Sequence, residues 1–570
     1  MNILGIHIGH DSSACLVRDG RIVADVAEER FTRAKHCSGP PLSAVGYCLE
    51  SQNLTMKDID AVAIPSNAPV VALNEMLDLK GPRQEKRSLA GRVEDQARRY
   101  LKRTTTKPPL YIKNFPLPDS VPLVRVEHHL AHAASAYYTG GTAEKQLIVT
   151  MDGSGDGVCI ALWRGENGRI EPLQKFSNEA SLGFFYGNVT EALGWWHGDG
   201  EGKTMGLAPY GDPDKARGVL DRFCPKFSGG QLVEPIQFRG PYSWNQGGAM
   251  QWHFDDAYDI QALVHKHGRE HIAAEAQRLL EEQSKELIFP WLEKEKTRNL
   301  SCSGGIFLNV KLNQRVWESG RVDRHWIYPN AGDSGLAVGA ALHVYHQMNP
   351  GKPIGTIVSL YWGPEYSEKQ IEAVLQLRQL PYRRVDNVEE YVARQLAEDK
   401  IVAWFQGRME SGPRALGNRS ILMSSNRKEN KDIINARVKF REAFRPFCPS
   451  LLWESRHDYL ENARDEFFMI TSFTCKGPKR DKVPAVVHAD ATLRPQTVQQ
   501  TFNPRYWTLI NEFGKLTGEP LLLNTSLNIM SEPVINHPRE AIRCFYDNGL
   551  DLLVMGNFVL SKDKQQTARG

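Results

Sequence analysis

Residues 2–27, with the sequence NILGIHIGHDSSACLVRDGRIVADVA, decide the fold of this chain. Apolar residues dominate 3–8, a polar break follows at 9–13, and a second apolar run ends at Asp19-Gly20, after which a third run begins. An Asp-Gly pair between two apolar runs is typical of a tight hairpin turn. The stretch therefore predicts a strand, a polar loop, a second strand, a hairpin turn and a third strand.

The same pattern recurs later in the chain. Residues 147–151 predict a strand, DGSGDG at 152–157 predicts a loop, and 158–163 and 170–173 predict two further strands around a glycine-rich turn. Helical patterns lie between and after the copies, most clearly at 260–296, where apolar residues recur among charged ones. Two copies of one pattern predict an internally duplicated α/β fold whose helices cover the sheets.

A change of composition divides the chain. NPGKPIG at 349–355 and Trp-Gly-Pro-Glu at 362–365 interrupt the regular patterns, so we place the main boundary between about 348 and 365. This predicts one domain at 1–355 and a smaller α/β domain at 356–570. Within the second domain, the patterns predict helices at 371–377 and 388–396 and strands at 401–405 and 520–523.

Composition excludes several classes of protein. Among 570 residues, 70 Lys and Arg stand against 67 Asp and Glu, which argues against a surface shaped for nucleic acid or for anionic membrane. The nine cysteines form no Cys-x-x-Cys pair, so neither a disulfide scaffold nor a thiolate zinc site is expected. No window approaches the ~18 apolar residues of a membrane span. We therefore expect a soluble, cytoplasmic protein that binds neither nucleic acid nor membrane.

Two histidines and two carboxylates form a candidate metal site. His128 and His132 are spaced i, i+4, which places them on one face of a helix. Asp152 and Asp333 each lie in a glycine-containing turn, although Asp333 could equally be a helix N-cap. The zinc-peptidase pattern does not fit, because no Glu lies between the histidines. Two imidazoles and two carboxylates suit a divalent transition metal.

Three glycine-rich stretches predict a nucleotide cleft between two lobes. They are residues 152–157, 202–206 and 303–305, and none is a Walker A or a dinucleotide motif. Glycines at such turns let backbone N–H groups approach phosphate oxygens, although each stretch alone is more often a simple turn. The candidate nucleotide-binding residues are Ser12, Gly153, Gly155, Lys203, Gly206, Gly304, Gly305 and Asn309.

His10 is a candidate general base. It lies in the first polar loop beside Asp11 and Ser12, where a duplicated fold of this kind presents its first phosphate-facing turn. The ordinary pKa of an imidazole suits proton transfer near neutral pH. A loop histidine without a catalytic task is the alternative.

Cations gather in the second domain. GRMESGPRALG at 407–417 is followed by Arg419, Arg437, Lys439, Arg441 and Arg445, and Arg494 comes later. An RNA-binding strip is the competing interpretation, but few aromatic residues are interleaved for base stacking. Arginine forks that hold small phosphorylated ligands fit the pattern better.

An ordered set of motifs carries a resemblance to a known family. The motifs are HDSSACLVRDG at 10–20, EERFTRAKH at 28–36, HHLAHAASAYY at 128–138, SLGFFYG at 181–187, GKTMGLAPYG at 202–211, GRMESGPRALGNRS at 407–420, RPFCPS at 445–450, RPQTV at 494–498 and LNTSLN at 523–528. Over essentially its whole length, the chain resembles the O-carbamoyltransferases of the nodulation-factor, cephamycin and aminoglycoside type.

The resemblance implies a fold for each domain. Residues 1–355 are expected to be similar to the threonylcarbamoyl-transferring enzyme of tRNA modification, within the fold shared by actin, sugar kinases and heat-shock chaperones (ASKHA). Residues 356–570 are expected to be similar to its carbamoyl-adenylate-forming, YrdC-like partner.

The resemblance also implies roles for individual residues. It makes His128, His132, Asp152 and Asp333 the ligands of a metal that is usually iron, and it makes His10 the base, with Lys35 nearby. The expected clamp for carbamoyl phosphate and ATP consists of Arg414, Lys439, Arg445, Arg494 and Asn528.

One departure from the family affects this clamp. The family often has a basic residue shortly after the position of Asn528, where this chain has Met530. Either Arg437 or Arg441 could supply the missing cation.

The expected reaction is ATP-dependent O-carbamoyl transfer in two steps. Carbamoyl phosphate and ATP give carbamoyl adenylate, and the carbamoyl group then passes to a hydroxyl of a sugar or small natural product, as in antibiotic biosynthesis and other secondary metabolism. The expected cofactors are ATP, Fe²⁺ in the first domain and Mg²⁺ with ATP. The alternatives are carbamoylation for tRNA or hydrogenase-cofactor assembly, and a non-catalytic nucleotide-binding regulator.

The acceptor itself is not specified by the sequence. Trp195, Trp196 and His197 could form an aromatic floor for it, although a core role for the tryptophans is as reasonable. An insertion at about 65–120 is a candidate wall. The oligomeric state is not fixed either, and a homodimer is compatible with the sequence.

Overall fold

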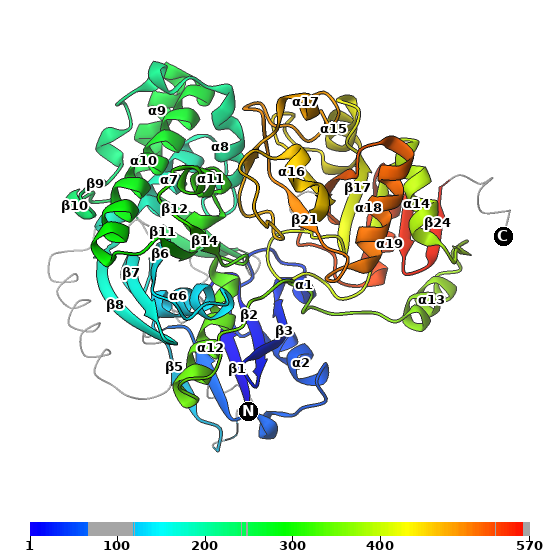
Figure 1. The fold of residues 1–570 in the computed structure, drawn as a ribbon, viewed down its shortest axis with the longest axis horizontal. Coiled ribbons are helices and arrows are strands. Elements are labelled where there is room, and N and C mark those ends of the chain that lie inside the picture. Colours follow the sequence, from blue (N-terminus) through cyan, green and yellow to red (C-terminus); the bar gives the residue numbers. More distant parts are fainter. Residues whose placement is uncertain (67–117, 119, 241, 247–248, 530–531, 563–570) are drawn as a thin grey trace.

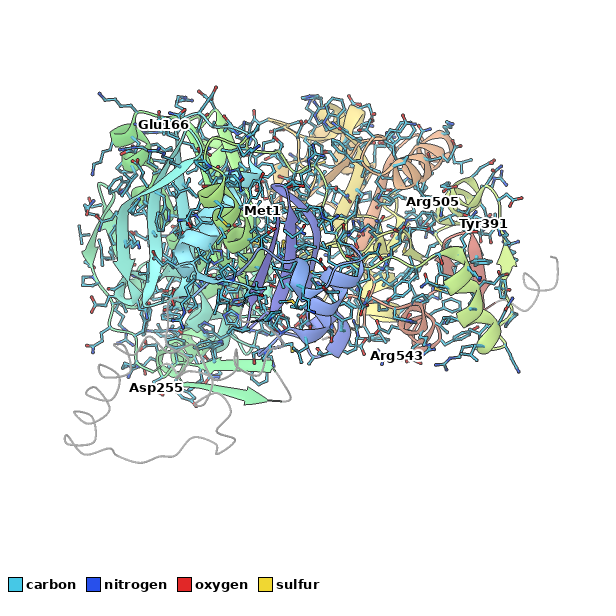
Figure 2. The ribbon with its side chains drawn as sticks, turned by 90° about the horizontal axis from the view of Figure 1, so that it is seen from below. Met1, Glu166, Asp255, Tyr391, Arg505 and Arg543 are labelled. Atoms are coloured by element: carbon cyan, nitrogen blue, oxygen red, sulfur yellow. The ribbon has the colours of Figure 1, made fainter. Side chains whose placement is uncertain are left out.

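The computed structural model describes residues 1–66, 118, 120–240, 242–246, 249–529 and 532–562. It shows two α/β parts side by side, an N-terminal part up to residue 348 and a C-terminal part from residue 364 (Figure 1). Figure 2 shows the same division from below, with Met1 and Glu166 in one part and Tyr391 and Arg505 in the other.

The first sheet has the strand order β3-β2-β1-β4-β5. β2 pairs antiparallel with β1 and β3, whereas β4 runs parallel to β1 and β5 parallel to β4. Asp19 and Gly20, which join β2 to β3, both have positive φ, as the predicted hairpin turn requires. The strands are β1 (Asn2–His7), β2 (Ser13–Arg18), β3 (Arg21–Ala27), β4 (Ala61–Ile64) and β5 (Leu123–Arg125).

The second sheet repeats this topology, with the order β14-β13-β6-β7-β8. Three antiparallel strands are again followed by two parallel ones, so the duplicated fold predicted from the sequence is confirmed. The strands are β6 (Gln146–Gly155), β7 (Val158–Glu166), β8 (Arg169–Ser177), β13 (Asn299–Ser303) and β14 (Arg324–Ile327).

One detail of the second sheet differs from the prediction. β6 continues through most of the predicted 152–157 loop, because its pairing with β7 resumes at Gly155 after a register shift. Only Asp156 and Gly157 form the turn, both at positive φ.

Two helices occupy the space between the sheets. α6 (His128–Thr139) crosses α12 (Leu336–Met348) so closely that a Cβ on Gly339 would lie 1.8 Å from the carbonyl oxygen of Ala131. The alanines of both helices are buried in one core together with β1 and β2 residues. Small side chains thus bring the N-terminal end of α6 to the junction of the two lobes.

The remaining helices cover the outer faces. α2 (Leu42–Glu50) covers the first sheet, which we call the first lobe together with α1 (Glu29–Thr32). The second lobe consists of the second sheet and the helices α7 (Leu182–Ala192), α8 (Glu201–Leu207), α9 (Asp256–His267), α10 (Arg269–Glu295) and α11 (Val310–Glu318). The helical pattern predicted at 260–296 is confirmed, and it comprises two helices, because Gly268, at φ +91°, separates α9 from α10.

Two short hairpins complete the second lobe. They are β9 (Lys226–Ser228) with β10 (Gln231–Glu234), and β11 (Tyr242–Gln246) with β12 (Ala249–His253).

The C-terminal part is built on an eight-stranded mixed sheet in the order β15-β24-β23-β16-β17-β22-β18-β21. Its helices pack on two faces, with α14 and α18 in one apolar core and α13 and α19 in the other. The predicted helices at 371–377 and 388–396 and strands at 401–405 and 520–523 are confirmed as α13, α14, β16 and β22.

The elements of the C-terminal part are, in chain order, α13 (Glu368–Leu377), β15 (Arg383–Arg384), α14 (Val388–Ala397), β16 (Val402–Phe405), β17 (Arg419–Ser424), α15 (Glu429–Ile434), β18 (Cys448–Leu452), α16 (Arg456–Tyr459), β19 (Phe473–Thr474), α17 (Gly477–Arg480), β20 (Thr492–Leu493), β21 (Gln496–Val498), α18 (Pro504–Thr517), β22 (Leu521–Ser526), α19 (Pro538–Asp547), β23 (Leu552–Met555) and β24 (Phe558–Ser561).

Arginines fasten the two parts to each other. Arg30 donates to the carbonyl of Gly412 at 2.9 Å, and Arg33 donates to that of Val534 at 2.8 Å. From the other side, Arg408 donates to the carbonyl of Val23 at 3.0 Å. In the described portion of the chain, no helix combines the length and apolar character needed to cross a membrane.

Candidate active sites

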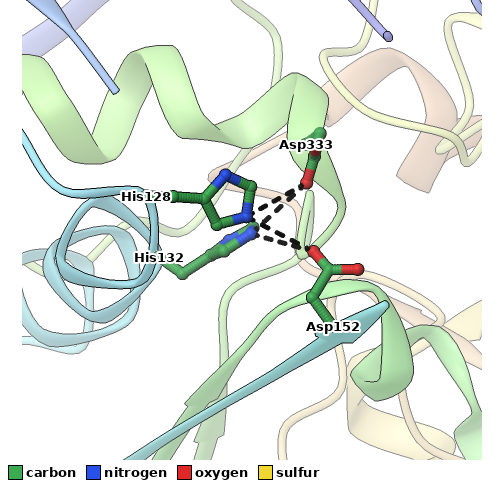
Figure 3. Close-up of side chains that lie close together, drawn as sticks. All are labelled: His128, His132, Asp152 and Asp333. Atoms are coloured by element: carbon green, nitrogen blue, oxygen red, sulfur yellow. Dashed lines mark hydrogen bonds and ion pairs between the residues drawn. The ribbon is translucent and has the colours of Figure 1, made fainter. Parts of the chain in front are cut away.

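Four metal-binding side chains converge where the two lobes meet (Figure 3). His128 and His132 lie on α6, Asp152 on β6, and Asp333 just before α12. One ligand atom of each lies within 4.8 Å of the others. His132 Nε2 is 3.1 Å from Asp152 Oδ2 and 3.4 Å from Asp333 Oδ1, and His128 Nε2 is 3.7 Å from both carboxylates.

The chemistry of this cluster fits a divalent metal. Nε2 of His128 is buried and has no hydrogen-bond partner among the described residues, and such an atom is costly unless a ligand satisfies it. Burial favours the neutral form of Asp152, but the neighbouring imidazoles of His128 and His132 outweigh it and hold the pKa of Asp152 well below its ordinary value. Asp152 is therefore ready to act as an anionic oxygen ligand beside two imidazoles.

Glycines predicted to bind nucleotide form the walls of this cluster. A Cβ on Gly155 would lie 2.1 Å from Cδ2 of His128, and one on Gly305 would lie 3.1 Å from Oδ1 of Asp152. Gly304 has φ +102°, and its Cβ would meet the carbonyl oxygen of Met151 at 2.2 Å. Gly153 is less constrained, since its Cβ would lie 3.2 Å from Phe184. Close packing on the His128 ring therefore accounts for glycine at 155, and the Met151 backbone together with the positive φ accounts for glycine at 304.

His10 lies directly beside the metal cluster. Its Nε2 is 3.1 Å from Oδ2 of Asp333, and its Nδ1 is 2.9 Å from Oδ2 of Asp11. Burial by itself lowers the pKa of His10, but Asp333 and Asp11 outweigh it and raise that pKa to about 9. The His10 side chain is 36% exposed, so a small molecule can reach it. Lys35, in contrast, forms an ion pair with Asp199 rather than with His10.

The other predicted nucleotide-binding residues have varied surroundings. The hydroxyl of Ser12 is buried without a hydrogen-bond partner among the described residues. Lys203 lies 3.6 Å from Glu442 of the C-terminal part and 5.9 Å from the ring centre of Trp195. Asn309 caps α11 by accepting from the Leu312 N–H, so its side chain already has a structural task.

The predicted glycine-rich loop at 202–206 is wrong, because this segment lies within α8. Tertiary packing outweighs the low helix propensity of glycine here. Thr204 is buried and lies 2.8 Å from the hydroxyl of Thr190. Gly206 lies against the C-terminal part, where its Cβ would be 3.4 Å from Cδ of Pro446.

Arg414, Arg441, Arg445 and Arg494 form a cationic cluster in the C-terminal part. Burial, together with the neighbouring Arg494, lowers the pKa of Arg414 to about 9. Burial and the neighbouring Arg445 and Arg494 have the same effect on Arg441. Two carboxylates oppose the cations, Glu442, 3.9 Å from Arg445, and Asp199, which also acts on Arg445. Buried cations that mainly face one another predict an anionic ligand.

Lys439 and Asn528 lie together at the edge of this cluster. Lys439 Nζ is 2.7 Å from Oδ1 of Asn528 and 2.5 Å from the carbonyl of Ser526. Burial and the neighbouring Arg441 hold the pKa of Lys439 well below its ordinary value. Asn528 also donates to the carbonyl of Glu532 at 2.7 Å. The side-chain nitrogen of Lys439 is therefore held in a fixed place by backbone and amide oxygens.

The two candidates for the missing cation occupy different places. Arg437 pairs with Asp551 at 3.0 Å, whereas Arg441 stacks on Phe447 and shares its electrostatic neighbours with the cluster. Met530 lies outside the described residues. The sequence could not show which of the two arginines belongs to the cluster, because both are arginines in the same cation-rich stretch.

A partly open pocket, with room for about 30 Å³ of water-sized spheres, lies between α8 and the C-terminal part. Lys311, on α11, lines it and pairs with Asp490 of the C-terminal part at 2.5 Å. The other lining residues are Met205, Gly206, Pro209, Tyr210, Val310, Lys431, Phe444, Pro446, His488, Ala489 and Arg494. The pocket thus adjoins both the cationic cluster and the second lobe.

The residues proposed to contact the acceptor have three different environments. Trp195 is flanked by Arg269, 5.0 Å from its ring centre, while Trp196 is 54% exposed. His197 stacks on Phe254 with ring centres 5.1 Å apart. They do not form one continuous floor. The candidate wall at 65–120 lies almost entirely outside the described residues.

Family models match both parts of the chain. The model described as "Carbamoyltransferase N-terminus" matches residues 2–342, and the one described as "Carbamoyltransferase C-terminus" matches 393–562. The chain belongs to the carbamoyltransferase family. This carbamoyltransferase is 34% identical to nodulation protein NolNO of Sinorhizobium fredii over 97% of its own length and 79% of that protein. It is 35% identical to nodulation protein NolO of Bradyrhizobium diazoefficiens over 77% and 79% of the two chains.

Proposed function

We propose that this protein is an ATP-dependent O-carbamoyltransferase with two separate active sites. A carbamoyl-adenylate-forming, YrdC-like domain would occupy residues 356–570, and the carbamoyl-transfer domain residues 1–355. The observation that carries the proposal is the pairing of a cationic cluster in one part with a metal-type cluster and an adjacent histidine in the other.

The first half-reaction is proposed for the cationic cluster. Carbamoyl phosphate loses inorganic phosphate to water, and the resulting carbamate attacks ATP, giving carbamoyl adenylate and pyrophosphate. Arg414, Arg441, Arg445 and Arg494 would hold the phosphate groups, because each is buried or half-buried among other cations and gains most from an anionic partner. Lys439, fixed by Asn528, would contact the same anions, with Mg²⁺ accompanying ATP.

The second half-reaction is proposed for the junction of the lobes. His128, His132, Asp152 and Asp333 would hold a divalent metal, for which we propose Fe²⁺, and such a metal would supply Lewis acidity. Nε2 of His10 would accept the proton of the acceptor hydroxyl. The hydroxyl oxygen then forms the new bond to the carbamoyl carbon, and AMP leaves with the electrons of the broken bond.

We propose that the intermediate passes from one part to the other beside this pocket. Arg494 lines it on one side and Met205 and Gly206 line it on the other. A carbamoyl adenylate that passes here between the two parts would avoid bulk water, which would hydrolyse it. The fusion of the two domains into one chain is consistent with this role.

The proposed acceptor is a hydroxyl of a small sugar or natural product. We propose this class rather than tRNA or a hydrogenase cofactor because the motifs resemble those of nodulation-factor carbamoyltransferases, and two relatives are nodulation proteins. All nine cysteines are unpaired, which supports a reducing, cytoplasmic location.

The test is pyrophosphate release from the purified protein with ATP and without any acceptor. We expect release to depend on carbamoyl phosphate, to be abolished by Arg414→Ala and to be retained by His10→Asn. Arg437→Ala is the matched control, since Arg437 pairs with Asp551 outside the cluster. ATP binding without carbamoyl-phosphate-dependent release would overturn the proposal in favour of a nucleotide-binding regulator.

A further inference from the structure

A chain of alternating charges leads away from His10. Oδ2 of Asp11 is 2.9 Å from Nδ1 of His10, and Oδ1 of the same carboxylate is 2.8 Å from Nδ1 of His36. Nε2 of His36 is 3.2 Å from Oδ1 of Asp199, which also pairs with Lys35. Both oxygens of Asp11 and both nitrogens of His36 are therefore engaged.

The backbone supports this arrangement at two unusual positions. Asp11 has φ 61° and His36 has φ 55°, so both partners of one ion pair are in the left-handed region that side chains rarely adopt. The two loops are joined by hydrogen bonds from Ser12 N–H to the Cys37 carbonyl at 2.9 Å and from Gly39 N–H to the Ile8 carbonyl at 3.0 Å. Backbone strain of this kind, held by its surroundings, is characteristic of functional sites.

The charges of the two central groups are well defined. Burial favours neutral Asp11, but His36 and His10 outweigh it and keep the pKa of Asp11 well below its ordinary value. Burial likewise lowers the pKa of His36, but Asp11 and Asp199 raise it to about 10. Near neutral pH, a carboxylate therefore faces Nδ1 of His10, and an imidazolium faces the carboxylate from behind.

A carboxylate at Nδ1 determines how an imidazole presents its other nitrogen. It accepts a hydrogen bond from Nδ1–H, so the ring keeps this tautomer and directs Nε2 the opposite way, here towards Asp333 and the metal cluster. When Nε2 takes up a proton, the positive ring remains next to a negative group. The His36 cation keeps the Asp11 carboxylate in place and prevents it from turning towards the metal cluster.

We propose that Asp11 and His36 are positioning residues for the carbamoyl-transfer step, in which Asp11 fixes the orientation of His10 and His36 fixes Asp11. This rests on the proposed role of His10. Asp199 comes from the α7–α8 segment of the second lobe, whereas the other members come from the first lobe. The arrangement is therefore complete only when the two lobes are in contact across the cleft.

The test separates positioning from folding and from the first half-reaction. We expect Asp11→Asn to leave acceptor-free pyrophosphate release and thermal stability within about twofold and a few degrees of the wild type. AMP release with methyl glucoside as the probe hydroxyl is expected to fall about 10²-fold, the lower end of what a general base contributes. His36→Gln should lower this AMP release about tenfold. Asp19→Asn and His265→Gln, conservative changes at an exposed turn and on exposed α9, are the matched controls.

Two further readouts decide the question. If Asp11 acts through His10, Asp11→Asn will cause no further loss in a His10→Asn background, and an additive loss would overturn the proposal. Independently of activity, the Nδ1–H proton signal of the His10 ring, assigned with His10→Asn, should lie far downfield in the wild type because of the hydrogen bond to Asp11, and should move upfield or disappear in Asp11→Asn. Unchanged ring signals would overturn the positioning role even if the proposed reaction is correct. Absence of carbamoyl-phosphate-dependent pyrophosphate from the wild type would instead refute the proposed function.

Discussion

Asp25, on β3 of the first lobe, accepts a hydrogen bond from the hydroxyl of Ser411 in the C-terminal part. Asp25 is 1% exposed, and its other carboxylate oxygen has no hydrogen-bond partner among the described residues. Burial raises the pKa of Asp25 from 3.8 to about 7, and the Ser411 hydrogen bond only partly opposes this. The contact between the two parts therefore contains a carboxyl group that prefers to stay protonated.

This predicts a pH-dependent stability that Asp25→Asn removes. Between pH 3.8 and about 7, the unfolded chain loses the Asp25 proton while the folded protein keeps it, so the free energy of unfolding falls as the pH rises. Below pH 3.8 Asp25 is protonated in both states, so it does not lower the free energy of unfolding. Above about pH 7 the lowering is complete, at roughly 4 kcal/mol, which is three pKa units at 1.36 kcal/mol each. Denaturant unfolding at pH 4, 6 and 8 should show this decline in the wild type and not in Asp25→Asn.

The control for this measurement is Asp386→Asn, since the Asp386 side chain is 95% exposed. Its stability should follow the wild type at every pH. Parallel curves for wild type and Asp25→Asn would contradict the assignment of the pH dependence to Asp25.

The geometry of the metal cluster predicts that substitution of Gly155 lowers metal affinity and that substitution of the neighbouring Gly157 does not. In Gly155→Ala, the new methyl group would collide with the His128 ring, so metal affinity should fall about 10- to 100-fold, as when a ligand loses its orientation. In Gly157→Ala, the new Cβ meets open space, and only the φ of +84° is unfavourable, at about 1 kcal/mol of stability. Titration with Fe²⁺ or Co²⁺ followed calorimetrically distinguishes the two. Equal affinities in both variants would show that His128 is not a ligand.

The assignment of Arg441 to the cationic cluster predicts a kinetic difference from Arg437. A charged contact to phosphate contributes ~1.5–3 kcal/mol, so Arg441→Ala should lower kcat/KM for carbamoyl phosphate about 10- to 100-fold in pyrophosphate release. Arg437→Ala should change it less than about twofold, because Arg437 pairs with Asp551 at 3.0 Å. The reverse order of effects would identify Arg437 as the cation that replaces the missing basic residue.

Local pattern accounts for the parts of this structure that the sequence predicts well. The Asp19-Gly20 turn and the i, i+4 spacing of His128 and His132 depend on backbone geometry that neighbouring residues set by themselves. The duplication of the sheets followed from the recurrence of the strand and turn pattern. The cationic cluster was visible because its members lie within a short stretch, apart from Arg494.

Long-range packing accounts for the parts that the sequence did not predict. Residues 202–206 are helical because α8 packs against α7 and Pro446, contacts that no local pattern reveals. The Asp11–His36 pair joins residues 25 positions apart, and nothing in either motif marks the other as its partner. In the sequence, nothing distinguishes Asp25 from other polar residues of a strand. Its raised pKa arises from burial, which the fold alone produces.

The proposed route between the active sites predicts that the two glycines of α8 respond differently to substitution. Gly206 lines the pocket and its Cβ would contact Pro446 at 3.4 Å, whereas a Cβ on Gly202 would meet open space. Gly206→Leu should therefore obstruct the pocket, leaving pyrophosphate release unchanged and lowering AMP release with a hydroxyl acceptor at least tenfold. Gly202→Leu adds the same side chain to the same helix and should leave both rates unchanged. If Gly206→Leu lowers neither rate, the intermediate reaches the metal cluster by another path, and if it lowers both equally, the residue acts on adenylate formation rather than on passage.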